Sequence, residues 1–251
     1  MARLDDIVAF CDHLTRRASI KDFPGSHNGL QLANNGSVSK VGSAVDAGLE
    51  PFRRAAAAGV EFVIVHHGMF WESVIPVVGR HRDRLALCLH NNIAVYGAHL
   101  PLDAHPEIGN NAILARRLGL HVSGTFLPYE GVDIGLVADF GLSRDDLKVR
   151  LSQEFPGGFK AIEFGDHAPE RIGILTGSGS SAVDKLRAAG VDTLVTGELR
   201  QQWFNFAQEE GLNLYVCGHY ATEVYGVQAL AEAVSREFHI ENTFIRTDCP
   251  L

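Results

Sequence analysis

The fold is decided by the order of elements in residues 57–68, which read Ala57-Ala58-Gly59-Val60-Glu61-Phe62-Val63-Ile64-Val65-His66-His67-Gly68. The alanines end a helical pattern, and Gly59 stands where the end of a helix needs a left-handed residue. The apolar run that follows is typical of a buried strand, and two histidines come directly after it. A helix, a glycine stop and a buried strand in this order indicate an α/β protein.

The same pattern recurs 131 residues further along the chain, without a gap. Lys40-Val41-Gly42 matches Arg171-Ile172-Gly173, Gly48 matches Gly179, and residues 57–61 match Ala188-Ala189-Gly190-Val191-Asp192. Each copy reads strand, helix, glycine, strand, and each leads to a further helix and a strand that ends near Gly-His. Convergence on a common α/β unit is the alternative explanation, but the matched spacing favours an internal duplication. We therefore predict two similar three-layer α/β halves.

The boundary between the halves is expected near residues 119–128, after a helix that stops at Gly119. The first half is predicted to comprise residues 1–124, joined by the C-terminal segment 219–251, and the second half residues 125–218. An amphipathic helix should open the first half, because Leu4, Ile7, Val8, Cys11 and Leu14 fall on one face.

The composition limits the functions that need to be considered. The 251 residues include 22 Lys and Arg and 30 Asp and Glu, which gives a formal net charge of -8 and makes nucleic acid an unexpected partner. The sequence lacks the apolar run of a signal peptide or a membrane helix. Four widely spaced cysteines without a CxxC pair suggest reduced thiols. We expect a cytoplasmic protein with no membrane contact.

Three motifs at predicted strand ends carry residues that can bind metals. His66 and His67 close the strand of residues 62–65, at the edge of an α/β sheet where ligands bind. Adjacent strand residues point to opposite faces, so the two rings should reach different points, which suits two metals. On its own, a histidine pair of this kind is also common as a surface or capping pair.

The second motif is His99-Leu100-Pro101-Leu102-Asp103-Ala104-His105. If the strand before it continues, His99 and Asp103 share a face, and Asp103 can offer both oxygens as a bridge between two cations. His99 and His105 are either ligands or residues that orient the ligands.

The third motif is Gly218-His219-Tyr220-Ala221-Thr222-Glu223. An apolar strand ends there and a helix opens, so His219 and Glu223, four residues apart, project the same way if the helix starts at once. Glu223 can equally be an acid that favours a helix N-terminus. Together the three motifs supply His66, His67, Asp103, His219 and Glu223. This is the ligand mix of two divalent ions such as zinc, iron or manganese, and we expect the site in the cleft between the halves.

These motifs, with the Asn28-Gly29-Leu30-Gln31 loop, Gly109-Asn110-Asn111 and Thr196-Gly197-Glu198, closely resemble the Nif-three-like dinuclear metal-centre family. Members of that family are often called GTP cyclohydrolase I type 2 homologues. The resemblance covers essentially the whole chain. It implies a two-half α/β protein with a dinuclear metal site whose ligands fall on the five residues above, and assembly into a hexameric ring.

Two classes of function remain in competition. A metal-dependent hydrolase would use a water activated by two cations to attack a small-molecule substrate, such as a phosphate ester or a nucleotide. The alternative is a non-enzymatic metal-binding interaction or regulatory ring protein. Five ligands shared by two ions leave open coordination positions, which favours catalysis.

Other polar residues have less certain roles. Glu198 corresponds to His67 under the offset of 131 residues and is a candidate general base, or else a solvated acid. His27 and Asn28 either line the pocket or shape a turn. Residues 177–180, Gly-Ser-Gly-Ser, resemble a phosphate loop but lack its Gly-Lys-Ser/Thr ending, so we interpret them as a turn.

Overall fold

The structure is a computed structural model that describes residues 1–71 and 75–250. Its contacts divide the chain into two compact units. The first contains residues 1–108 and 226–248, and the second contains residues 109–225 and 249–251. Both units are α/β, each with one mixed sheet. Among the described residues, no helix has the length and apolarity that crossing a membrane requires.

The first unit is built on a five-stranded sheet in the order β13-β4-β5-β6-β2, in which β2 alone is antiparallel to its neighbour. A short ladder of β1 and β3 accompanies it. The elements are β1 Ala2–Arg3, α1 Leu4–Leu14, β2 Gly29–Leu32, β3 Ser37–Val38, β4 Lys40–Asp46, α2 Leu49–Ala57, β5 Phe62–His67, α3 Gly79–His90, β6 Ala94–Gly97, α4 Leu100–Asp103 and β13 Glu241–Phe244.

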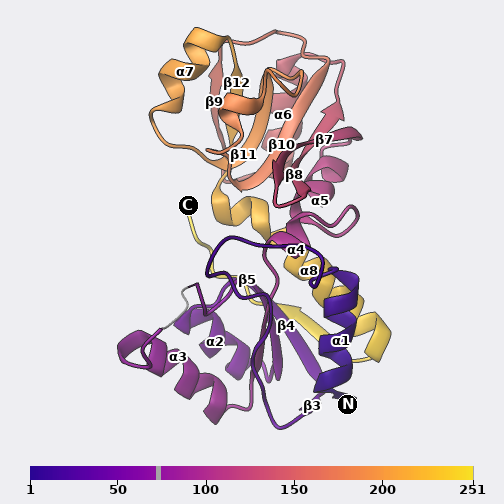
Figure 1. The fold of residues 1–251 in the computed structure, drawn as a ribbon, viewed down its shortest axis with the longest axis vertical. Coiled ribbons are helices and arrows are strands. Elements are labelled where there is room, and N and C mark those ends of the chain that lie inside the picture. The colour runs from indigo at the N-terminus through magenta and orange to yellow at the C-terminus, as the bar shows by residue number, and fades with distance from the viewer. Residues whose placement is uncertain (72–74, 251) are drawn as a thin grey trace. The chain divides into compact units, whose positions relative to one another are not determined.

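Alternating strand residues of the first sheet enter two separate cores. Phe62 and Ile64 pack with α1 and with the later turns of α8, His219–Phe238. Val63 and Val65 pack on the opposite face with α2 and α3. Figure 1 shows α2 and α3 on one side of β4 and β5, and α1 with the end of α8 on the other. The sheet is therefore the middle of three layers, as a buried parallel sheet requires.

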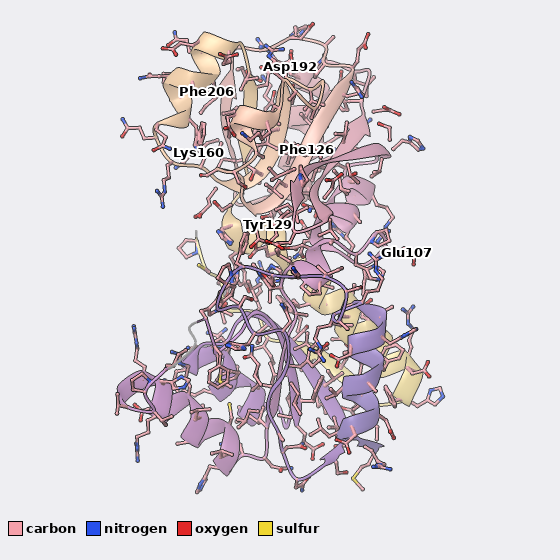
Figure 2. All side chains as sticks on the ribbon, in the orientation of Figure 1. Glu107, Phe126, Tyr129, Lys160, Asp192 and Phe206 are labelled. Atoms are coloured by element: carbon pink, nitrogen blue, oxygen red, sulfur yellow. The ribbon has the colours of Figure 1, made fainter. Side chains whose placement is uncertain are left out.

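The second unit is built on a six-stranded sheet in the order β7-β8-β10-β11-β12-β9. The strands β10, β11 and β12 are parallel to one another, while β8 and β9 are antiparallel to their neighbours. The elements are α5 Asn110–Arg117, β7 His121–Tyr129, β8 Val132–Asp139, α6 Arg144–Glu154, β9 Lys160–Glu163, β10 Arg171–Ser178, the 3-10 helix η1 Val183–Lys185, β11 Thr193–Glu198, α7 Trp203–Glu210 and β12 Asn213–Val216. Phe126 of β7, labelled in Figure 2, belongs to one of the two cores of this sheet.

The repeat seen in the sequence corresponds to a shared strand order. β4 and β10 begin 131 residues apart, and so do β5 and β11. The strand order β4-β5-β6-β2 of the first sheet corresponds to β10-β11-β12-β9 of the second, with three parallel strands followed by an antiparallel edge strand. Gly59 and Gly190 both adopt positive φ, 68° and 70°, as the glycine stop predicted. The helix expected before Gly190 is reduced to the short η1, so the second copy departs from the pattern there.

Residues 109–124 and 219–225 lie in the second unit, whereas the sequence analysis placed them with the first half. The reason is the packing of α5, whose Leu114 and Ala115 share a core with Ile172 and Ile174 of β10. The boundary expected after residue 124 falls inside β7.

Candidate metal centre

His66 is a fully buried histidine near the end of β5. Its Nδ1 lies 2.9 Å from the carbonyl oxygen of Ala98. A carbonyl oxygen only accepts hydrogen bonds, so Nδ1 carries a proton, and in the neutral ring Nε2 keeps a lone pair. That Nε2 lies 3.4 Å from Oδ2 of Asp103. In the neutral ring these two acceptor atoms face each other, and a cation bound by both would offset their repulsion.

His67 and His99 are oriented in a similar way, by carboxylates. The Nδ1 of His67 lies 2.8 Å from Oδ1 of Asp46, and the Nδ1 of His99 lies 2.8 Å from Oδ1 of Asp22. A carboxylate on Nδ1 fixes the ring and leaves Nε2 as the nitrogen that can bind a metal. Asp46 stands opposite His67 in the β4–β5 ladder, which explains how a strand end supplies this partner.

The three histidines converge on one place in the first unit. His66, His67 and His99 can each offer one ligand atom, and these atoms lie within 4.8 Å of one another. The ring centroids of His66 and His67 are only 5.0 Å apart. The two rings make different contacts, since one turns to Ala98 and the other to Asp46, yet their ligand atoms stay close together.

Asp22 holds His99 through a small hydrogen-bond network. Burial alone would raise the pKa of Asp22, but hydrogen bonds from His99, Asn28 and the Phe23 backbone lower it to about 2. Asn28 donates to Asp22 at 2.7 Å and accepts from the backbone N–H of His99 at 2.7 Å. Of the two loop residues considered in the sequence, Asn28 thus positions the histidine group. His27 packs its ring against Phe70.

Asp103 lies on a helix and not on a strand. The strand β6 ends at Gly97, and Pro101 lies in the first turn of the short helix α4. Proline is favoured at the first turn of a helix, so the continued strand that the sequence analysis considered is wrong. His99 and Asp103 nevertheless lie four residues apart around this turn, which keeps them on the same side.

His105 stabilises a turn of the backbone. Its Nδ1 accepts the backbone N–H groups of Glu107 and Ile108, both at 3.1 Å. Burial and the nearby Arg16 lower its pKa. The described residues place His105 in this turn and outside the histidine group.

The second unit carries its own group of ligand residues at the start of α8. The helix begins at His219, so Glu223 lies one turn later, and its Oε1 is 3.2 Å from Nε2 of His219. Glu198, at the end of β11, places Oε1 3.3 Å from Nδ1 of the same ring. The pKa of His219 is raised to about 9, first by the hydrogen bond with Glu223 and then by Glu198, against the opposing effect of burial. The two carboxylates thus favour positive charge at this position.

Glycines allow the backbone to pack directly against this pair. Gly177 has a φ of +64°, and a Cβ there would lie 2.1 Å from Oε1 of Glu223. At Gly197 a Cβ would lie 2.6 Å from the hydroxyl oxygen of Thr222 and 2.8 Å from Cα of His219. Of the amino acids, only glycine fits at these two positions without displacing its neighbours.

The donor set has the chemistry of a divalent transition-metal site. Histidine nitrogens and carboxylate oxygens suit zinc, iron or manganese. Burial raises the pKa of Cys88 and of Cys217 to about 12, so these thiols stay protonated and are poor ligands. The described residues thus contain groups that could hold metal ions.

Sequence reasoning missed the carboxylates that orient the histidines. Asp46 ends the strand beside the one that carries His67, so the order of the strands was a usable signal, although the register that pairs the two residues was not. Asp22 lies in a loop far from His99 in sequence, and no local pattern pointed to it.

Two mixed α/β sheets with histidine and carboxylate groups at the ends of their parallel strands define a class of α/β proteins with a candidate metal centre. The profile of the family Duf34/NIF3 (NGG1p interacting factor 3) matches residues 2–250. The chain belongs to this family.

Relatives and solved structures agree over nearly the whole chain. The Escherichia coli K12 protein named GTP cyclohydrolase 1 type 2 homolog is 40% identical over 232 residues, which is 91% of each chain. A protein of the same name from Archaeoglobus fulgidus is 35% identical and covers 96% of this chain and 97% of its own. The crystal structure of TTHA1606 from Thermus thermophilus is 37% identical, covers 100% of both chains and superposes with a TM-score of 0.87. The ybgI protein, described as of unknown function, is 33% identical with a TM-score of 0.91 and covers 100% of both chains.

Proposed function

We propose that the protein is a hydrolase that depends on two divalent metal ions, with His66, His67, Asp103, His219 and Glu223 as ligands. The proposed substrate is a small phosphate ester or nucleotide-like molecule. The histidine group of the first unit carries the proposal. Three rings are held through Nδ1 by oxygen atoms, and their ligand atoms lie within 4.8 Å of one another. This is the orientation that metal-binding histidines need.

The chain's own residues set what the site can do. When bound, divalent ions act as Lewis acids and make a water molecule nucleophilic near neutral pH. Asp103 offers two oxygens and a negative charge that offsets repulsion between cations. Glu198, half exposed and beside His219, is the proposed general base that takes the proton of the attacking water. The name of the curated relatives makes GTP a natural member of any substrate panel.

Asp103→Asn tests the proposal, because the change keeps the size of the side chain and removes its charge. Metal content is measured by elemental analysis on purified protein reloaded with zinc, iron or manganese. Turnover is measured on the same samples with GTP and aryl phosphate esters. We expect two ions per wild-type chain and about one or fewer in the variant. Turnover should fall about 100-fold or more, the scale of a lost metal-ion contribution of several kcal/mol.

Asp139→Asn is the matched control, because it removes another carboxylate that faces a histidine, His121, on the exposed surface of the second unit. This control should retain both metal and turnover. A wild-type chain that holds fewer than two ions after reloading contradicts the dinuclear site. Full metal content without turnover on any member of the panel favours the non-enzymatic alternative.

A further inference from the structure

The loop after β10 lies where the parallel strands of the second sheet end. Residues 177–180 were interpreted from the sequence as a turn, but Gly177 and Ser178 are the last two residues of β10 and only residues 179 and 180 lie in the loop. In the β10–β11 ladder Ser178 stands opposite Glu198, and the N–H of Gly179 donates to the carbonyl oxygen of Glu198 at 3.1 Å. The carboxyl ends of parallel strands are the usual place for ligands in α/β sheets.

A hollow of about 280 Å³ opens beside this loop, lined by Ser178, Ser180, Glu198, Leu199, Arg200 and Gln202. Arg200 also lines a second hollow of about 510 Å³ together with Gln201 and Asn205. The hydroxyl, amide and guanidinium groups around these hollows are hydrogen-bond donors, and guanidinium matches phosphate geometry through paired N–H groups.

The donors of the smaller hollow are available to a ligand. Within the described part of the chain, Arg200 forms no ion pair, and neither its guanidinium nor the hydroxyls of Ser178 and Ser180 are engaged in a hydrogen bond. Five other arginines of this unit do contact a carboxylate or a carbonyl oxygen: Arg117, Arg144, Arg150, Arg171 and Arg187. Arg200 differs from these in facing a cavity and not a protein acceptor.

Glu198 joins this hollow to the candidate metal ligands. It lines the hollow, and its Oε1 lies 3.3 Å from Nδ1 of His219. The strand end before the loop contacts the other ligand, since Gly177 packs against Glu223. A molecule that reaches His219 can therefore extend past Glu198 to Arg200. The negative charge of Glu198 repels an anionic group, which therefore binds more favourably on the Arg200 side of the hollow.

We propose that Ser178, Ser180 and Arg200 form a binding subsite for a phosphate group that is not cleaved. Resting on the proposed function, this defines the substrate as a compound with at least two anionic groups, one at the metal ligands and one at Arg200. The neighbouring hollow of about 630 Å³ is lined by Lys160 of β9 (Figure 2), by Glu198, and otherwise by glycine, apolar and cysteine residues. It suits the uncharged part of a ligand better.

The test uses inorganic phosphate as the probe and the full-length chain freed of metal by a chelator, so that neither metal nor turnover enters the measurement. Calorimetric titration compares wild type with Arg200→Gln, Arg200→Lys and the double variant Ser178→Ala/Ser180→Ala. We expect one phosphate per wild-type chain and affinity about 10-fold or more weaker in Arg200→Gln, as for the loss of a charge-assisted hydrogen bond. The phosphate affinity of Arg200→Lys should lie between those of wild type and Arg200→Gln, because lysine keeps the positive charge but loses the paired N–H donors of the guanidinium group.

Lys160→Gln and Asp139→Asn are the controls, and both should bind phosphate within about twofold of wild type, since surface changes elsewhere cost little. Equal weakening in Lys160→Gln and Arg200→Gln, or no effect of Arg200→Gln, overturns the subsite. Wild type that binds no phosphate at about 10 mM, too weak for a specific site, overturns it as well. The phosphate titration is made without metal, so its result does not depend on whether the protein binds two metal ions. The proposed phosphate subsite and the proposed dinuclear site can therefore be contradicted independently.

Discussion

Asn111 is a buried side chain that joins three elements of the second unit. From α5, its Nδ2 donates to the carbonyl oxygen of Ile134 on β8 at 2.9 Å. Its Oδ1 accepts the backbone N–H of Thr176 on β10 at 2.7 Å. Thr176 immediately precedes Gly177, so this amide fixes the strand end that packs on Glu223. Asn111 belongs to a motif that resembles a functional one, but its role is to hold the strand end that supports the site.

Asn111→Leu should destabilise the protein by about 2–4 kcal/mol, because it leaves two buried backbone groups without hydrogen-bond partners. Thermal melting measures the loss, and hydrogen exchange should become faster at the Thr176 amide. Asn91→Ala is the control, since Asn91 is exposed and donates only to Leu87 of its own helix. It should change stability by about 0.5 kcal/mol or less. Equal melting of the two variants would contradict the assigned role.

At the residue scale, the sequence identified most of the histidines and carboxylates but not their orientation. The spacing of His219 and Glu223 was sufficient to predict that the two side chains lie together, because residues four apart in a helix that begins at His219 share a side. The pairing of His67 with Asp46 depends on the register of β4 against β5, which no local pattern specifies. The loop that brings Asp22 to His99 depends on the tertiary fold in the same way.

The end of β10, with the loop that leads to η1, is the element that contacts both the ligand pair and the proposed phosphate subsite. Its course depends on Gly177, whose positive φ and lack of a Cβ let the chain pass over Glu223. The stability cost of a left-handed alanine is modest, but the clash with Glu223, a proposed metal ligand, is specific to this position.

Gly177→Ala should therefore reduce the number of bound metal ions, because the new Cβ would lie 2.1 Å from Oε1 of Glu223 and must displace it. Gly141→Ala is a close control, with a φ of +62° and no atom within 4 Å of an added Cβ. Both variants should lose about 1–2 kcal/mol of stability from backbone strain. Elemental analysis after metal reloading separates them, and the prediction is wrong if Gly177→Ala retains as much metal as Gly141→Ala.

Elements with strong periodicity were predicted well, and short ones were not. The first helix runs from Leu4 to Leu14, the two ends of its predicted apolar face. The antiparallel edge strands β2 and β9 have four residues each, too few for alternation to distinguish them from loops. The turn at Leu100–Asp103 was misjudged because a strand and a short helix both place residues i and i+4 on one side.

At the scale of the whole molecule, the repeat describes two sheets of related strand order, each with candidate ligand residues near the carboxyl ends of its parallel strands. The strands β4 and β5 of one unit and β10 and β11 of the other come from the repeated part of the sequence, whereas β13 in one sheet and β7 with β8 in the other are additions outside it. The additions determine how many strands each sheet contains, and the shared strands position the ligand residues.

Assembly is the prediction for the whole molecule, and it rests on the resemblance to the Nif-three-like family. We expect a ring of six chains of 27.3 kDa each, about 164 kDa together. Each chain carries a formal charge of -8, so the like charges of neighbouring subunits oppose assembly.

This repulsion acts over about 30 Å at 0.01 M salt and only about 8 Å at 0.15 M, so the hexamer should dissociate more readily at low ionic strength. Sedimentation velocity at micromolar concentration in both buffers measures the assembly. Six chains at 0.15 M, with smaller species increasing at 0.01 M, is the expected result. A monomer that persists in both buffers rules out the ring for this protein, and a hexamer indifferent to salt shows that repulsion between subunits does not govern its stability.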